Sequence, residues 1–212
     1  QGAGIYTAGI IAGGTSPPSV VNSTETWNGT SWSETHEINT ARYGMGLSGT
    51  TTATLGAGGN TGTVVANVES YNGSSWTEVA DINTARGQGL SSGTNADCIL
   101  AGGATPTVVA ITEYWDNSSW TEVADMATAR ETQASTTSSS TSAYAAGGSG
   151  TTSFAGTEEW ATAPVTSTFK NEGQVYYNST SNVLKLTSTV FGTGAWASGN
   201  SMSTARGVFA GF

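Results

Sequence analysis

A Trp followed ten residues later by the Arg of a Thr-Ala-Arg tripeptide occurs four times in the chain. The first three of these Trp residues are 44 residues apart. A constant period of this length is typical of proteins built from stacked repeats, in which each repeat is one supersecondary unit. The pattern therefore indicates a repeat architecture. The pairs are Trp32 with Arg42, Trp76 with Arg86, Trp120 with Arg130, and Trp196 with Arg206.

Three further features keep step with the Trp–Arg pair, and together they outline four short strands per repeat. One strand follows the Arg, one ends at a di-glycine, one carries Glu-x-aromatic, and one carries the Trp. Asn-Gly before the Trp predicts a type I′ hairpin, which needs positive φ at both central residues. Four antiparallel strands in 44 residues correspond to one blade of a β-propeller. The di-glycines lie at 13–14, 58–59, 102–103 and 147–148, and the Glu residues are Glu25, Glu69, Glu113 and Glu158.

This order of apolar run, Gly-Gly, aromatic residue and Trp, with an Arg opening the next unit, resembles the kelch repeat. The resemblance covers residues 1 to about 160 and 195–212, and it implies an all-β, kelch-like β-propeller as a single domain, 1–212. We expect repeats at about 39–82, 83–126 and 127–170. The first blade is expected to combine 1–38 with 207–212, so that strands from both termini close the ring and remove free sheet edges.

Residues 161–195 break the period, because Trp120 and Trp196 are 76 residues apart. We expect a hairpin here, from segments 174–178 and 182–186. With the Trp196 strand, this hairpin would form an irregular fifth blade within 171–206, while 165–170 would be the outer strand of the preceding blade. Five blades are therefore predicted. A ring of four blades with an inserted hairpin is the alternative.

The interrupting segment carries the sequence Gly-Gln-Val-Tyr-Tyr-Asn-Ser-Thr-Ser-Asn-Val-Leu-Lys at 173–185. It resembles a hairpin of tail-fibre and other virion proteins of marine and cyanobacterial phages, which stands beside kelch-like repeats with Asn-Thr-Ala-Arg, as at 39–42 and 83–86. The resemblance implies a virion or extracellular location, and partners among other virion proteins, copies of itself, or a host-surface glycan or protein. We expect a non-enzymatic structural and adhesion module. The alternative is a secreted or cell-surface bacterial propeller that binds carbohydrate.

The recurring charged and aromatic side chains are expected to be structural. A binding site rarely needs one copy in every blade, whereas the packing of one blade on the next does. An Arg fork can bond to backbone carbonyls and to a repeat Glu in the adjacent blade. These structural repeat residues are Arg42, Arg86, Arg130, Arg206, Glu25, Glu69, Glu113, Glu158, Trp32, Trp76, Trp120 and Trp196.

The sequence contains few residues that could carry out catalysis or bind a metal. His36 is the single histidine, no Gly-x-Ser-x-Gly motif is present, and Cys98 is the single cysteine. We therefore expect no catalytic residues, no cofactor and no metal, with His36 in a solvated loop and Cys98 buried as a small apolar residue. Carboxylates recur in one repeat phase at Glu37, Asp81 and Asp125. They would suit weak Ca²⁺ binding, but solvated loops are the favoured interpretation.

A net charge of −9 with six basic residues excludes a cluster that could neutralise nucleic-acid phosphates. No apolar run approaches the roughly 18 residues of a spanning helix, so no membrane span is expected. Ligand contacts are instead expected in the loops after the di-glycines, which differ between repeats. The candidate ligand-facing residues are Thr15, Ser16, Asn60, Thr61, Thr105, Thr107, Ser149 and Thr151.

Overall fold

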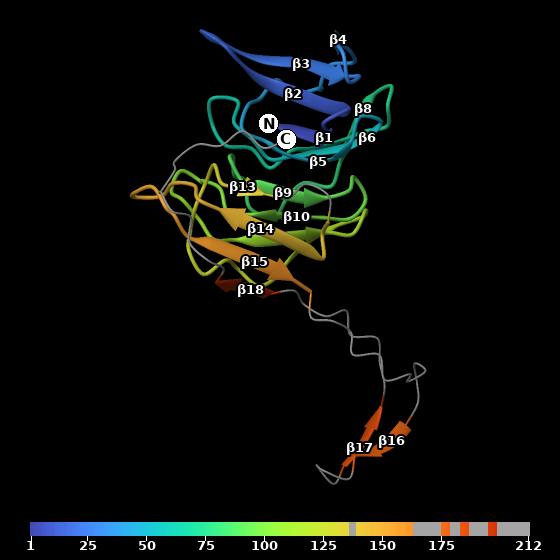
Figure 1. Cartoon of the computed structure of the whole chain (residues 1–212), viewed down its shortest axis with the longest axis vertical. Coiled ribbons are helices and arrows are strands. Elements are labelled where there is room, and N and C mark those ends of the chain that lie inside the picture. The colour runs from blue at the N-terminus through green and yellow to red at the C-terminus, as the bar shows by residue number, and fades with distance from the viewer. Residues whose placement is uncertain (136–138, 163–174, 179–182, 187–194, 199–212) are drawn as a thin grey trace.

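The computed structural model describes residues 1–135, 139–162, 175–178, 183–186 and 195–198, and in these residues the regular structure is entirely β. Four four-stranded antiparallel sheets follow one another as the blades of a β-propeller (Figure 1). Each is a meander, in which neighbours along the chain pair in the sheet, except that the last blade ends on β18. The all-β propeller expected from the repeat is confirmed.

The strand bounds reproduce the four-strand reading of each repeat. The second strand of the second blade, for example, ends at Ala57, directly before its di-glycine, and the fourth begins at Trp76. Blade 1 comprises β1 (Gly2–Ile5), β2 (Ala8–Ser16), β3 (Ser19–Trp27) and β4 (Trp32–Glu34). Blade 2 comprises β5 (Gly46–Thr50), β6 (Ala53–Ala57), β7 (Val68–Tyr71) and β8 (Trp76–Val79). Blade 3 comprises β9 (Leu90–Gly93), β10 (Cys98–Ala101), β11 (Thr112–Trp115) and β12 (Trp120–Glu122). Blade 4 comprises β13 (Ala134–Ser135), β14 (Ser142–Ala146), β15 (Thr157–Ala161) and β18 (Ala195–Ser198).

The apolar core lies between the blades. Because successive side chains point to opposite faces of a strand, each blade has a leading face toward the preceding blade and a trailing face toward the next. Ile10 and Ala12 on the trailing face of blade 1 share a buried cluster with Leu47, Tyr71 and Trp76 on the leading face of blade 2. Two further clusters join blade 2 to blade 3 and blade 3 to blade 4 in the same way. Burial is therefore repeated at each joint between blades.

The number of blades differs from the prediction. β18 pairs with β15, with Trp196 opposite Trp160, so the Trp196 strand completes the fourth blade and does not begin a fifth. The five-blade prediction is wrong, and the alternative of four blades with an inserted hairpin is confirmed. The insertion stands between the third and fourth strands of one blade, and a sequence period cannot show that strands so far apart in the chain are neighbours in the sheet. The segment 165–170, expected as an outer strand, lies outside the described residues.

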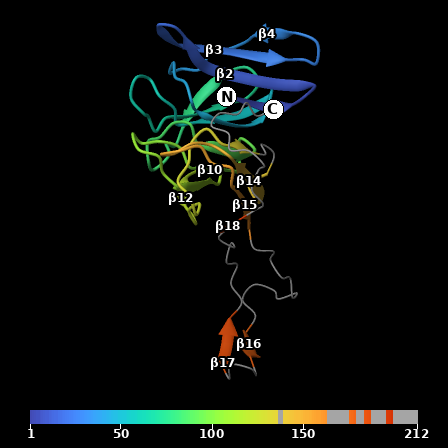
Figure 2. The ribbon, with the colours of Figure 1, turned by 60° about the vertical axis from the view of Figure 1, so that its left-hand side comes forward.

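The predicted hairpin is present as β16 (Val175–Asn178) and β17 (Val183–Leu186), which pair antiparallel from Val175 opposite Leu186 to Asn178 opposite Val183. The two strands form a sheet of their own and do not join a blade ladder (Figure 2). Blade 4 therefore tolerates a long insertion between two strands that remain paired with each other.

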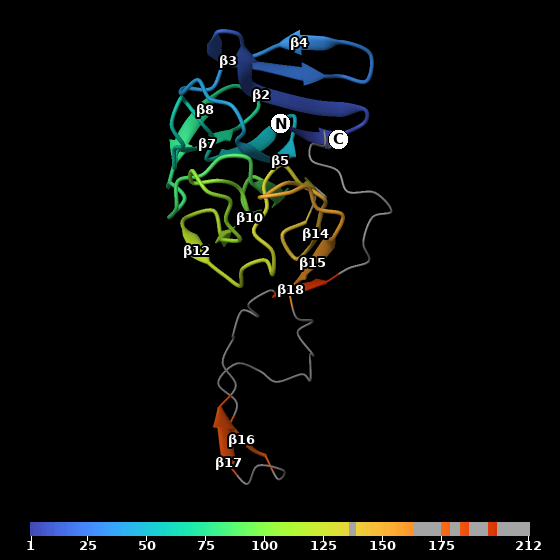
Figure 3. The same ribbon diagram turned by 90° about the vertical axis from the view of Figure 1, so that its left-hand side faces the viewer.

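The ring is open between blade 4 and blade 1. The innermost strands pack in succession, β1 on β5, β5 on β9 and β9 on β13, and the blades follow one another around an arc (Figure 3). The prediction that strands from both termini close the ring is wrong for the described residues. Residues 2–34 supply all four strands of blade 1, so β1 already holds the innermost position assigned to 207–212. Residues 207–212 themselves lie outside the described part of the chain.

The described turns before Trp32, Trp76 and Trp120 also differ from the predicted type I′ hairpin. Trp27 pairs with Trp32, which leaves a four-residue loop, 28–31. Asn28 Oδ1 accepts hydrogen bonds from the backbone N–H groups of Thr30 and Ser31, and only Gly29 has a positive φ, 91°. In blade 3 the loop is 116–119, where Asp116 accepts the same bonds and Asn117 has the positive φ. The Asn is therefore favoured for its side-chain acceptor in blades 1 and 2.

Candidate functional site

A buried arginine and glutamate join blade 2 to blade 3. Arg86 lies in the linker between the blades, and its guanidinium donates to a carboxylate oxygen of Glu113 on β11. It also donates to the carbonyls of Thr84, Leu100 and Gly102 at 2.9, 3.0 and 3.1 Å. Both side chains are shielded from solvent. The arginine is thus fully engaged in holding the next blade.

The carboxylate of Glu113 is equally occupied. One oxygen accepts hydrogen bonds from the backbone N–H and the side-chain amide of Asn83, each at 2.7 Å. The other oxygen accepts the backbone N–H of Thr84 at 3.3 Å in addition to the Arg86 bond. A buried charge is tolerated when it is paired and hydrogen-bonded in this way. Glu113 therefore has no free acceptor directed at a ligand.

The same joint occurs at the other two boundaries between described blades. Arg42 pairs with Glu69 at 2.5 Å, and Arg130 pairs with Glu158 at 2.6 Å. Ala127 stands at the Asn position of the third linker, and its backbone N–H still donates to Glu158 at 2.6 Å. The structure thus places three Arg and three Glu of the predicted structural set in inter-blade joints. Arg206 lies outside the described residues.

The linker arginine also holds its own blade through its backbone. The carbonyl of Arg86 accepts the N–H of Gly59 at 2.9 Å, and Gly14 and Gly103 donate to Arg42 and Arg130 in the same way. The preceding glycine, Gly58, has φ 64°, and a Cβ there would lie 2.3 Å from the Arg86 carbonyl oxygen. Only glycine combines this backbone conformation with so close an approach. The di-glycine is therefore part of the joint.

The repeat tryptophans divide into two kinds. Trp76 and Trp120 are each 6% exposed, and their indole N–H groups donate to the carbonyls of His36 and Ala80, just after the last strand of the preceding blade, at 2.9 and 3.0 Å. Trp32, at the same repeat position, is 47% exposed because no blade covers the leading face of blade 1 in the described residues. The side chain of Trp196 lies outside the description, although its strand is described.

The loops after the di-glycines leave the same end of the blades, where the second strands end and the third begin. Three of these loops share one pattern of β-bridges. The first residue after the linker Arg forms a bridge to a loop residue, and that loop residue forms a second bridge to the residue four positions on. Blade 1 differs, because β2 and β3 continue as a long hairpin with a bulge between Ala12 and Gly14. The bridges are Tyr43–Asn60–Val64, Gly87–Ala104–Val108 and Glu131–Ser149–Ser153.

The predicted ligand-facing residues lie on these loops and do not form one pocket. Five of them are solvent-exposed, and the other three are partly buried. Thr61 and Thr105 each donate through Oγ1 to a carbonyl two residues on, at 3.3 Å, so the loop tips are internally bonded. The exposed members are Thr15, Thr61, Thr107 and Thr151, together with Ser16 at the tip of the blade 1 hairpin.

Other titratable groups are dispersed. His36 is exposed, and Glu37 accepts a hydrogen bond from Asn22 at 2.8 Å. No three His, Cys, Asp or Glu side chains gather as metal ligands within the described residues. Cys98 is fully buried, and desolvation raises the pKa of its thiol to about 12. In the part of the chain that the structure describes, no helix is long and apolar enough to cross a bilayer.

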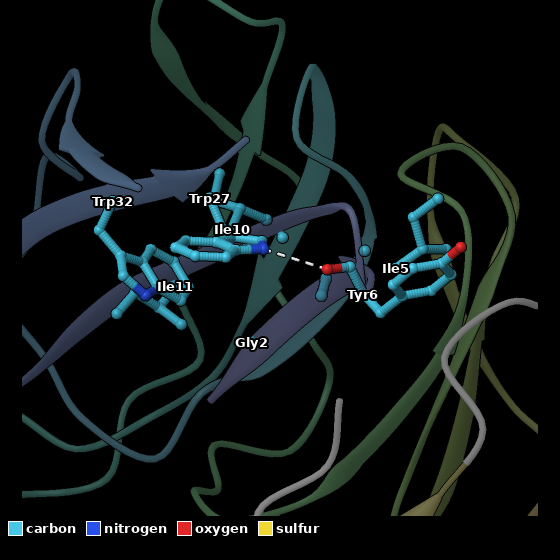
Figure 4. Close-up of a pocket in the computed structure, with 10 residues that line it drawn as sticks. Gly2, Ile5, Tyr6, Ile10, Ile11, Trp27 and Trp32 are labelled. Carbon is cyan, nitrogen blue, oxygen red and sulfur yellow. Dashed lines mark hydrogen bonds between the residues drawn. The ribbon is translucent and has the colours of Figure 1, made fainter. Parts of the chain in front are cut away.

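The leading face of blade 1 contains an open apolar groove that the sequence did not indicate. It has a cavity volume of about 350 Å³ and is lined by β1, β2 and the paired Trp27 and Trp32 (Figure 4). Trp27 donates to the Tyr6 carbonyl at 3.0 Å, so its ring is held within the blade. The repeat gives no signal for this groove, since Trp27 and Trp32 stand at the same repeat positions as the buried Trp115 and Trp120.

No family model matches the chain, and none of the curated proteins that were compared is significantly similar to it.

Proposed function

We propose that this chain is a non-enzymatic structural and adhesion module of a phage virion, in a tail fibre, a spike or the capsid surface. In this proposal, the loops after the di-glycines contact a glycan or protein of the host surface. The observation that carries the proposal is a constant framework with variable tips. The same ion pair recurs at each described joint between blades, and the loops at one end of the blades differ in sequence.

Contacts at fixed positions hold the loops to the blades. The loops of blades 2 and 3 leave their strands at a di-glycine held by a linker carbonyl, and the loops of blades 2, 3 and 4 are bridged at equivalent positions. Between these fixed points the tips read Thr-Gly-Thr at 61–63, Thr-Pro-Thr at 105–107 and Gly-Thr-Thr at 150–152. A rigid scaffold that positions variable loops is a common arrangement for binding surfaces.

The tips also suit the proposed ligand. They carry small hydroxyl side chains, which both donate and accept hydrogen bonds. Few charges accompany them in the loops that the structure describes, so binding would depend on hydrogen bonds more than on ion pairs. A surface of this kind fits a neutral glycan better than a polyanion.

The virion part of the proposal is supported by the resemblance of residues 173–185 to a hairpin of phage virion proteins. The β16–β17 hairpin forms its own two-stranded sheet, so its strand edges are not used by any blade ladder. Edges of this kind pair readily with strands of other chains. In this proposal the hairpin contacts neighbouring virion proteins, while the loop end of the blades faces the host.

Two measurements test the proposal. Gold labelling and mass spectrometry of purified virions are expected to find this chain on the particle surface, and its absence from the particle would reject the virion role. Adhesion is tested with a loop variant, Thr61→Ala with Thr107→Ala, in a host-cell adsorption assay. The expected result is a loss of binding, with Thr77→Ala on the exposed side of β8 as the matched control. Equal binding by all three proteins would reject the loops as the contact surface.

The alternative role has its own outcome. Binding of the purified chain to an array of bacterial glycans, lost in the same loop variant, combined with absence from virions, would favour a secreted or cell-surface carbohydrate-binding propeller.

A further inference from the structure

The leading face of blade 1 exposes side chains that the following blades bury. Trp32 is 47% exposed, whereas Trp76 and Trp120 at the same repeat position are 6% exposed. Ile11 is 40% exposed, whereas Leu100, also two residues before its di-glycine, is 1% exposed. Exposed large apolar side chains that gather on one face mark interaction sites. The face has the composition of a blade joint without its partner.

Glu25 places a carboxylate on the same face of blade 1. It lies opposite Ile11 and Glu34 in the sheet, as Glu113 lies opposite Leu100 and Glu122 in blade 3. Glu69, Glu113 and Glu158 each receive a linker Arg and at least two linker N–H groups. Among the described residues, none donates a hydrogen bond to the carboxylate of Glu25. Blade 1 thus carries an acceptor for a linker Arg that no described blade supplies.

The opposite end of the arc is complementary. Tyr144 on the trailing face of blade 4 is 41% exposed, whereas Leu55 and Ile99, also three residues before their di-glycines, are 1% and 0% exposed. The sequence after β18 continues to Ser-Thr-Ala-Arg at 203–206, ten residues from Trp196 to Arg206, as in every other linker. Blade 1 therefore carries an acceptor for which the described residues supply no donor, and the sequence after β18 carries the linker Arg of the repeat.

We propose that the leading face of blade 1 binds the trailing end of blade 4 from a second copy of this chain. In this head-to-tail joint, the carboxylate of Glu25 would accept the linker Arg that the repeat sequence places at position 206 of the second copy. Trp32 becomes buried against the second copy as Trp76 is buried against blade 1. The apolar groove of Figure 4 is filled by this contact.

The open ring favours a second copy over the chain's own fourth blade. In the described residues β13 packs on β9, and the leading face of blade 1 remains exposed. A joint between unlike faces is heterologous, so each bound copy presents a further free end. Association then continues into a larger ring or an array. This surface is separate from the loop end, and the inference stands independently of the proposed adhesion.

Sedimentation velocity of wild type, Glu25→Gln and Arg206→Gln over a concentration series tests the joint. Wild type is expected to associate as concentration rises, and each variant is expected to sediment as a monomer. A 1:1 mixture of the variants is expected to form a dimer, because the Glu25→Gln copy retains Arg206 and the Arg206→Gln copy retains Glu25. Glu34→Gln, an exposed change on the neighbouring strand, is the matched control and should associate as wild type does.

A monomeric wild type at every concentration would overturn the proposal. So would variants that lose association but recover nothing on mixing, because that result shows that Glu25 of one copy does not pair with Arg206 of another. Trp32→Ala gives a second readout, since it is expected to weaken association while the melting temperature of dilute protein stays close to that of wild type. Association unchanged in both Glu25→Gln and Trp32→Ala would move the contact to another surface.

Discussion

Arg86 and Glu113 belong to different parts of the fold, a linker and the third strand of the next blade, and they form an ion pair that no solvent reaches. The same linker offers its carbonyl to Gly59 of the blade behind it. One residue thus fastens two blades, through its side chain in one direction and its backbone in the other.

Arg86→Ala is expected to lower the free energy of unfolding by about 3–5 kcal/mol, because it leaves the buried carboxylate of Glu113 without its cation. The measurement is equilibrium denaturation in urea. Glu122→Ala, on the exposed side of β12, is the control and should shift the midpoint little. Unchanged stability in Arg86→Ala combined with lost ligand binding would instead assign this arginine to a binding site.

Trp76→Ala and Trp32→Ala are expected to differ strongly although the two residues share a repeat position. Truncation of buried Trp76 removes packing against Tyr71 and a bond to the His36 carbonyl, at a cost of about 3–5 kcal/mol. Trp32 is half exposed and should cost far less in dilute solution. Thermal melts of the two variants make the comparison. Equal losses would mean that the leading face of blade 1 is covered within one chain.

Asp116→Asn is expected to be tolerated, and Asp116→Ala is expected to lower the melting temperature. Hydrogen bonds from Ser118 and Ser119 stabilise the carboxylate and lower the pKa of Asp116. An Asn side chain oxygen accepts the equivalent bonds in the loops that begin at Asn28 and Asn72. Equal melting temperatures for the two variants would show that the side-chain acceptor at position 116 does not stabilise the loop.

Cys98 is expected to react with thiol reagents only after unfolding. Its pKa is raised from 9.0 to about 12, chiefly by desolvation, so the folded thiol stays protonated where the unfolded one ionises. The preference of the folded state for the protonated Cys98 thiol therefore costs no stability below pH 9. The free energy of unfolding falls as the pH rises from 9 toward 12. Urea midpoints at pH 8 and pH 10.5 should therefore fall further in wild type than in Cys98→Ala. Parallel falls in the two proteins would show that Cys98 ionises equally in both states.

The repeat made the blades predictable because a blade is defined by local signals. The apolar run before Gly58, the Glu at position 69 and the Trp at position 76 each recur at a fixed spacing, and each spacing fits within one meander. Strand order could be inferred because neighbours in the chain are neighbours in the sheet. The position of the inserted hairpin in the sequence was found for the same reason.

Relationships across long separations were not predictable from the period. Trp160 and Trp196 pair across the insertion, and this pairing, decided by the free edge of β15, reduced five expected blades to four. The first strand of blade 1 was missed because β1 contains none of the marker residues of the repeat. Side-chain exposure depends on which faces meet, so the difference between Trp32 and Trp76 also required the structure.

Because the linker arginine bonds to the blades on both sides of it, a 44-residue unit of one blade and its linker can be repeated without change. Each unit, a blade with the linker after it, supplies a Glu that pairs with the Arg of the preceding unit and an Arg that pairs with the Glu of the next. The same ion pair therefore serves every boundary between described blades. Duplicating or deleting one whole unit in the gene would leave every remaining boundary chemically matched. Blade number in such a protein can thus change by recombination in a single event, without the compensating substitutions that an ordinary core demands.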